Sequence, residues 1–123
     1  MQMEKIVQDG QAAVVLFSED VLLNDAQTAL DLMMTVQYET GASRIALNKE
    51  AITETFFDLS SNLAGEVLQK FINYHMKLAI YGDFSGYTSQ ALRDFIYESN
   101  QGRDIFFTAD RTEAVQRLLN APS

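Results

Sequence analysis

The chain has 123 residues, 47% of them hydrophobic, and its 17 acidic against 9 basic residues give a formal net charge of −8. This length suits one domain with a buried core, and the absence of cysteine excludes disulfides, thiolate metal sites and cysteine nucleophiles. The acidic excess disfavours nucleic acid and anionic membranes as partners, because both carry negative charge.

The amino terminus gives no sign of export. Residues 1–9 have neither a basic nor an apolar stretch, and no apolar run approaches the roughly 20 residues of a membrane helix. No Gly/Ser/Pro-rich linker or repeat interrupts the chain. We therefore expect a soluble, cytoplasmic protein that forms a single domain over residues 1–123.

A β-hairpin is predicted first. Strands over 5–7 and 12–17 flank Asp9 and Gly10, residue types that tolerate the positive φ angles of a tight turn. An antiparallel pair of strands should therefore open the fold.

A helix is predicted next. Asn24 is expected to cap it, with Gln27 returning a capping-box hydrogen bond, and Gly41 is expected to end it. Its apolar residues recur at spacings of three and four, and they are Ala26, Ala29, Leu30, Met33 and Met34.

The middle of the chain predicts a buried strand followed by a strongly amphipathic helix. Residues 44–47 form a short apolar run, typical of a strand that is covered on both faces. The helix is expected to begin at Ser60 or Ser61, either of which could cap it, and to end near Tyr74.

Two more strands and two more helices complete the chain. Residues 76–81 and 104–107 predict buried strands, and 88–100 predicts the helix between them. Asp110 and Glu113 form an acidic capping pair for a last helix.

The predicted order is ββαβαβαβα, which is typical of an α/β fold with a mostly parallel central sheet and an N-terminal hairpin. Ligands and partners of such sheets tend to bind at the carboxyl ends of the parallel strands. Those ends are followed by Asn48, Asp83 and Asp110, so we expect these three residues at one edge of the sheet.

Six segments carry a family resemblance: 38–41 (YETG), 44–52 (RIALNKEAI), 56–59 (FFDL), 63–66 (LAGE), 82–89 (GDFSGYTS) and 95–100 (FIYESN). Together they resemble a bacterial family catalogued as domain of unknown function 4180. The resemblance covers nearly the whole chain, and the family supplies no activity to carry over.

The order of strands and helices also resembles the STAS domain of bacterial anti-sigma-factor antagonists. That resemblance implies a phosphate-accepting serine or threonine at the start of the helix after the third strand. Ser60 and Ser61 are the nearest hydroxyl residues, while Leu59 and Asn62 depart from the STAS pattern. Two roles stay open for the serines, phosphate acceptor and helix cap.

The segment 82–89 joins a predicted strand to a predicted helix, where main-chain N–H groups often bind anions. It lacks the lysine of a P-loop and the spacing of a dinucleotide fingerprint, so a structural turn is the alternative. Phe84 and Tyr87 lie in this loop, and we expect them to be exposed and to mark a contact surface. Most of the other aromatic residues near the loops are expected in the core, and they are Phe56, Phe57, Phe106 and Phe107.

No metal site is predicted. Asp58, Asp83 and Asp110 could converge, and three carboxylates can hold Mg²⁺, but helix capping explains Asp110 and could explain Asp58. His75, the only histidine, is expected to stabilise the carboxyl end of a helix.

The leading hypothesis is a non-enzymatic regulatory or protein-interaction module that binds a protein partner or itself. No catalytic residue and no cofactor is predicted. The residues expected to contact a partner or ligand are Asn48, Lys49, Asp58, Asp83, Phe84, Ser85, Tyr87 and Thr88.

The alternative hypothesis is a small-ligand-binding or enzymatic domain. Its polar pocket would lie at the strand ends and would be lined by Asn48, Lys49, Asp83 and Ser85, with Lys49 as the charged anchor.

Overall fold

A computed structural model describes residues 1–122. Its elements are β1 (Gln2–Gln8), β2 (Gln11–Phe17), α1 (Ala26–Thr40), β3 (Arg44–Asn48), α2 (Leu63–Asn73), β4 (Lys77–Tyr81), α3 (Gln90–Gln101), β5 (Ile105–Thr108) and α4 (Arg111–Asn120). The five strands form one sheet in the order β1-β2-β3-β4-β5. Only β1 runs antiparallel to its neighbour, which confirms the predicted α/β fold with a mostly parallel sheet.

The N-terminal hairpin is confirmed. Gln8 pairs with Gln11 across a two-residue loop, in which Asp9 has φ 53° and Gly10 has φ 80°. Two successive left-handed residues make the turn whose twist matches that of the flanking strands. Both strands are longer than the sequence predicts: β1 extends from Gln2 to Gln8, and β2 begins at Gln11.

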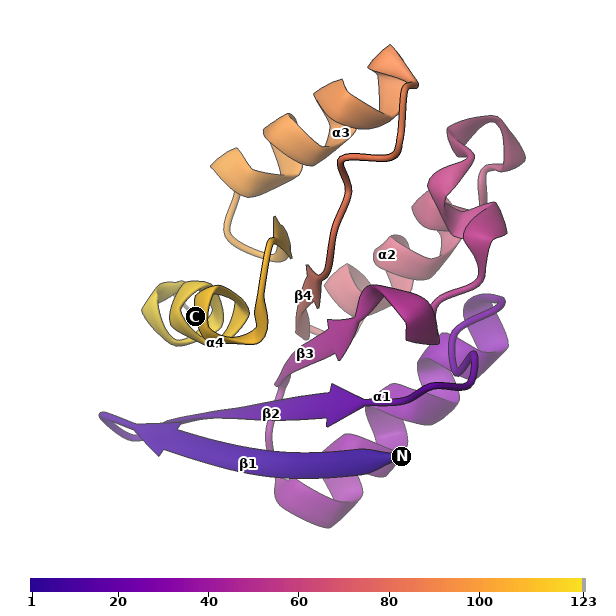
Figure 1. The fold of residues 1–123 in the computed structure, drawn as a ribbon. Coiled ribbons are helices and arrows are strands. Elements are labelled where there is room, and N and C mark those ends of the chain that lie inside the picture. Colours follow the sequence, from indigo (N-terminus) through magenta and orange to yellow (C-terminus); the bar gives the residue numbers. More distant parts are fainter. Residues whose placement is uncertain (123) are drawn as a thin grey trace.

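Helices cover both faces of the sheet (Figure 1), and a core of different size lies on each face. The helices α1, α2 and α3 pack on one face with the larger core. On the other face α4 alone packs across β2 to β5. Ala13, Ala46 and Ala79 lie on this face in adjacent strands, and their small side chains leave room for a closely packed helix.

Arg44 holds α4 against the sheet. Its side chain is buried and donates hydrogen bonds from Nη1 to the carbonyl oxygens of Leu118 and of Ala121, the latter at 2.8 Å. These oxygens lie at the carboxyl end of α4, where the helix dipole favours a positive charge. Burial lowers the pKa of Arg44 from its ordinary value.

The start of α1 differs from the prediction by one residue. Asp25 caps the helix: its carboxylate accepts the Thr28 N–H at 2.8 Å, and Thr28 Oγ1 accepts the Asp25 N–H at 3.1 Å. The predicted cap at Asn24 is therefore wrong, and Gln27 instead donates to Asp31 on the helix surface. The bonds from Thr28 lower the pKa of Asp25. The predicted end at Gly41 is confirmed by its φ of 73°.

The buried stripe of α1 also differs from the prediction. Ala29 and Met33 are buried as expected, but Met34 is 39% exposed. Leu32 and Val36 are buried in its place, so the apolar face is rotated toward them.

Two helix starts in the second half of the chain are set by capping side chains. Ser89 accepts the Leu92 N–H at 3.2 Å and begins α3, slightly later than predicted. Asp110 accepts the Glu113 N–H at 2.9 Å, which confirms it as the cap of α4. No helix within residues 1–122 is long and apolar enough to cross a membrane.

Candidate functional site

The carboxyl ends of β3, β4 and β5 lie side by side, as predicted. Asn48 pairs with Tyr81 and Tyr81 with Thr108, so Asn48 at the end of β3, Asp83 after β4 and Asp110 after β5 lie at adjacent strand ends. Two segments form this edge, residues 49–61 after β3 and residues 82–89 after β4. We call these two segments together the rim.

The first rim segment consists of three short 3-10 turns, η1 (Lys49–Ala51), η2 (Glu54–Phe57) and η3 (Leu59–Ser61). The N–H groups of Leu22 and Leu23 donate to the Ala51 carbonyl at 2.7 and 3.0 Å, which ties the segment to the chain before α1. Sequence periodicity gave no signal for these turns, because each spans only one turn of helix.

An aromatic cluster joins the two rim segments. The ring of Phe57 stacks on Tyr87 with centroids 5.2 Å apart and lies 6.0 Å from that of Phe84. Phe84 in turn makes an edge-on contact with Phe107 of β5 at 5.6 Å. Phe84 and Tyr87 are half-buried against the larger core, whereas Phe56, Phe57, Phe106 and Phe107 are buried. The two loop residues are therefore the most exposed of these six aromatic side chains, as predicted.

A second contact between the segments is polar. The Tyr87 hydroxyl donates to the Glu54 carboxylate, with oxygen distances of 2.7 and 3.0 Å. Partial burial and this acidic neighbour raise the pKa of Tyr87. Lys49 Nζ lies 5.1 Å from the Tyr87 ring centroid and 3.9 Å from Glu54 Oε1, so its charge faces both groups.

Lys49 also lies against the start of the second segment. A Cβ atom added to Gly82 would stand 2.8 Å from the Lys49 Cβ, which is too close for two carbon atoms. Glycine, which has no Cβ, avoids this overlap. Asp83 follows, and its carboxylate accepts the Ser85 N–H at 2.9 Å. Hydrogen bonds from Ser85, with a smaller effect of Lys49, lower the pKa of Asp83.

The serines before α2 belong to η3 and do not begin the helix. Asn62, in the left-handed conformation with φ 64°, precedes the first helical residue, Leu63, and its side chain makes no capping bond. The predicted helix start and cap at Ser60 or Ser61 are therefore wrong. Sequence reasoning missed this because a left-handed residue between a 3-10 turn and a helix leaves no mark in the apolar spacing.

Both serine hydroxyls have hydrogen-bond partners in the turn. Ser60 Oγ donates to Asp58 Oδ1 at 2.6 Å, and that same oxygen accepts the Ser60 N–H at 3.1 Å. Ser61 Oγ bonds to the carbonyls of Thr55 and Asp58 and accepts the Leu63 N–H at 3.2 Å. Asp58 thus caps η3, while the phosphate-acceptor role of the serines stays a prediction.

Asn48 lies inside the molecule. Its side chain is 2% exposed, and it bonds to both the N–H and the carbonyl of Ser18. Its two shorter hydrogen bonds are therefore made to the residue after β2, and Nδ2 makes a longer one, of 3.4 Å, to Glu50 Oε1 of the first rim segment.

The rim contains a hollow of about 480 Å³ between its two segments. Apolar and carboxylate side chains from the first segment face hydroxyl and backbone groups from the second. The lining residues are Glu54, Phe57, Asp58, Leu59, Ser60, Gly86, Tyr87, Thr88, Ser89 and Ala91.

Four of the residues predicted to form a site line this hollow, namely Asp58, Ser60, Tyr87 and Thr88. The remaining predicted residues lie outside its lining, and they are Asn48, Lys49, Ser61, Asp83, Phe84 and Ser85. Glu54 and Leu59 were not singled out from the sequence, because nothing in it shows that η2 and η3 fold beside 86–89.

No three carboxylate, imidazole or thiol side chains gather as metal ligands within residues 1–122. Asp58 and Asp110 each cap a turn or helix. His75 is exposed before β4, at the opposite edge of the sheet, and has φ 57°. Its main-chain N–H, rather than its side chain, bonds to a carbonyl of α2, that of Ile72, at 3.1 Å.

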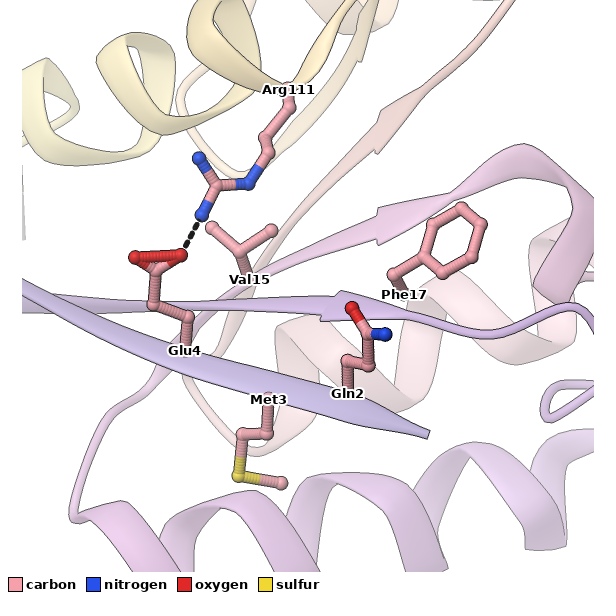
Figure 2. Close-up of a pocket in the computed structure, with 6 residues that line it drawn as sticks. All are labelled: Gln2, Met3, Glu4, Val15, Phe17 and Arg111. Atoms are coloured by element: carbon pink, nitrogen blue, oxygen red, sulfur yellow. Dashed lines mark hydrogen bonds and ion pairs between the residues drawn. The ribbon is translucent and has the colours of Figure 1, made fainter.

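A second hollow, of about 570 Å³, lies beside the N-terminal strand. Figure 2 shows Glu4 reaching from β1 to Arg111 at the start of α4, with which it forms an ion pair. Val15 and Phe17 lie on the same side of the sheet, while Met3 points to the other side. The sequence gave no indication of this hollow.

Three comparisons with known proteins were made. The model of a protein family described as "Domain of unknown function (DUF4180)" matches residues 8–118. The solved structure of the Bacillus cell fate determinant SpoIIAA in its phosphorylated form is 16% identical, covers 95% of this chain and 97% of its own, and gives a TM-score of 0.39. None of the curated proteins matches the chain.

Proposed function

Because the chain belongs to the DUF4180 family, whose description names no activity, we propose from its geometry that it is a non-enzymatic module that binds a protein partner. The contact surface is the hollow of the rim. Following the expectations from the sequence, the proposal places the protein in the bacterial cytoplasm and gives it a regulatory role.

The observation that carries the proposal is the lining of the hollow. Phe57, Leu59 and Ala91 contribute apolar groups to it, and Ser60 and Thr88 contribute hydroxyl groups. An apolar centre with a polar border is the usual composition of a protein-binding surface. One apolar side chain of a partner would fill the centre while its neighbours bond to the border.

The charge of the rim indicates the chemistry of the partner. Residues 49–61 and 82–89 contain four acidic residues and one basic residue. That basic residue, Lys49, already faces Glu54 and Tyr87. A partner segment with lysine or arginine beside an apolar residue would therefore complement the surface.

The rim is also preorganised. Tyr87 joins its two segments through Glu54 and Phe57, and Asp58 fixes the turn that carries Ser60. Side chains held in this way lose little conformational freedom when a partner binds.

The small-ligand alternative has weaker support. It needs Asn48, Lys49, Asp83 and Ser85 to share one pocket, but Asn48 is bound to Ser18 and the Asp83 carboxylate accepts the Ser85 N–H. The only histidine lies at the far edge of the sheet, which removes the most common general base from the rim.

Thr88→Arg tests the proposal, because it places a long cationic side chain at the mouth of the hollow. Thr88 is exposed, so the fold should tolerate the change. Thr35→Arg is the matched control, since Thr35 is also exposed but lies on α1. Proteins that the wild type and Thr35→Arg retain from a cell extract are identified, purified and titrated by calorimetry.

We expect Thr88→Arg to weaken binding of such a purified partner at least tenfold, about 1.4 kcal/mol. We also expect salt to weaken binding to the wild type, because screening reduces charge complementarity. Equal affinity of the two arginine variants would contradict the proposal. A metabolite that stabilises the wild type but not Lys49→Ala would favour the ligand-binding alternative.

A further inference from the structure

We propose that the free edge of β1 pairs with β1 of a second copy of the chain, antiparallel, about a two-fold axis normal to the sheet. β1 is the outermost strand and pairs only with β2 (Figure 1). Such an edge presents unpaired main-chain groups that can template another strand. The resulting sheet would run continuously through both copies, independently of the rim.

The hairpin determines which main-chain groups are free. A two-residue loop makes Gln8 and Gln11 a hydrogen-bonded pair, and such pairs alternate along an antiparallel ladder. Glu4 and Ile6 therefore direct their N–H and C=O groups at β2. Lys5 and its odd-numbered neighbours in β1 direct theirs outward, to the free edge.

Charge and the length of overlap together select one register among the symmetric pairings. Pairing centred on Met3 or Val7 sets only three residues of each β1 opposite each other. Pairing centred on Glu4 places two Glu4 carboxylates opposite each other, and pairing centred on Lys5 does the same with two ammonium groups. Like charges directly opposite are destabilising. Pairing centred on Ile6 sets Ile6 against Ile6, Lys5 against Val7 and Glu4 against Gln8 of the second copy.

The Ile6-centred register also covers exposed apolar surface. Val7 is 61% exposed, and Ile6 packs only partly against the smaller core. The same register puts Gln2 opposite Gly10 of the second copy. Because Gln2 lines the hollow beside β1 (Figure 2), each hairpin turn would lie close to that hollow in the other copy. Pairing in this register would therefore form main-chain hydrogen bonds and also bury side chains on both faces of the sheet.

The net charge of each copy predicts how the stability of the dimer depends on salt. Each copy carries a formal charge of −8, whereas β1 itself contains one acidic and one basic residue. The two copies repel each other at long range while their paired strands are neutral. Added salt screens the repulsion, so it should strengthen the dimer, opposite to its expected effect on the rim.

Single cysteine variants test the register, because the chain has no cysteine of its own. In the Ile6-centred register, the two residues at position 6 face each other as a pair whose Cβ atoms are about 5 Å apart. Ile6→Cys should therefore form a disulfide-linked dimer under mild oxidation. Lys5→Cys, one residue away on the same edge, should cross-link several-fold more slowly.

Equal cross-linking of the two variants, or faster cross-linking of Lys5→Cys, would overturn the register. The outcome is read by non-reducing electrophoresis and by the mass of the intact product. Lys5 is exposed and Ile6 is partly buried on the other face of the sheet, so a difference in exposure alone would favour cross-linking of Lys5→Cys.

Val7→Pro tests the edge itself. Proline removes a main-chain N–H, and at position 7 that N–H faces outward, so the bonds between β1 and β2 remain. Val7→Thr keeps the N–H and the strand preference, and it serves as the matched control.

We expect light scattering to give the wild type and Val7→Thr twice the mass of one chain at high protein and salt concentration. Val7→Pro should remain at the mass of one chain with an unchanged circular dichroism spectrum. A wild type that stays monomeric in all these conditions, or a dimeric Val7→Pro, would refute the pairing. Neither result bears on partner binding at the rim.

Discussion

The side chain of Asn48 forms two hydrogen bonds with the main chain of Ser18, in the way that the main chain of a neighbouring strand would. Asn48 Nδ2 donates to the Ser18 carbonyl at 2.7 Å, and the Ser18 N–H donates to Asn48 Oδ1 at 2.9 Å. Both residues are buried, so the side chain continues the pairing of β2 and β3 past the end of the ladder. The start of the first rim segment is fixed in this way.

Asn48→Ala should lower the free energy of unfolding by about 3 kcal/mol, because it leaves a buried N–H and a buried carbonyl of Ser18 unpaired. Urea denaturation measures the change. Asn73→Ala is the control: Asn73 accepts one bond on the exposed face of α2, and its loss should cost less than about 0.5 kcal/mol. Similar losses in both variants would show that the Ser18 bonds contribute little.

Gly82→Ala should destabilise the chain by about 1 to 3 kcal/mol, because the new methyl group would overlap Lys49 and force one rim segment to move. Gly86→Ala in the same loop is the control, since a Cβ there meets no atom within 4 Å. Thermal unfolding gives the melting temperatures of the two variants, and that of Gly82→Ala should be the lower. Equal melting temperatures would mean that the two rim segments separate without cost.

Tyr87→Phe should change how stability depends on alkaline pH. The pKa of Tyr87 is raised in the folded chain above its ordinary value of 10.0, so the unfolded chain loses the phenolic proton first. The stabilisation is therefore complete below about pH 10 and declines above it. Urea unfolding at neutral and alkaline pH should show a smaller alkaline loss for Tyr87→Phe than for the wild type.

Burial also raises the pKa of Tyr81, but that residue is present in both chains and its effect cancels in the comparison. At neutral pH, Tyr87→Phe should cost about 1 kcal/mol through the lost bond to Glu54. Parallel pH profiles for the two chains would show that Tyr87 ionises as readily in the folded state as in the unfolded one.

Arg44→Met should loosen α4 more than any other helix, because the carbonyls of Leu118 and Ala121 lose their donor. We expect a loss of about 2 to 3 kcal/mol, the range for bonds to a charged group. Hydrogen exchange followed by mass spectrometry should show faster exchange in α4 than in α1. Arg103→Met, at an exposed position, is the control and should leave both helices unchanged.

The sequence predicted the turns, helix ends and caps of the fold well where one or two neighbouring residues determine them. The left-handed turn at Asp9 and Gly10, the end of α1 at Gly41 and the cap of α4 at Asp110 each depend on one or two neighbouring residues. The buried run of β3 was visible because both of its faces are covered, which makes nearly every position apolar.

The site was less predictable, because it depends on contacts between distant segments. Glu54 and Tyr87 are 33 residues apart, and nothing local to either shows that they bond. The contact between Phe84 and Phe107 is of the same kind, since Phe107 belongs to another strand and nothing in the loop of Phe84 indicates it. Asn62 shows the remaining difficulty, as one left-handed residue moved the start of α2 past both serines.

The alanines under α4 have a consequence for synthesis of the protein. Because α4 follows all five strands in the chain, it can cover this face of the sheet only after the residues of every strand have been synthesised. Until α4 packs, Ala13, Ala46 and Ala79 keep small the apolar area that this face exposes beside Val15 and Phe106. Leucine at these three positions would expose a larger apolar area at that stage and would favour aggregation of the unfinished chain.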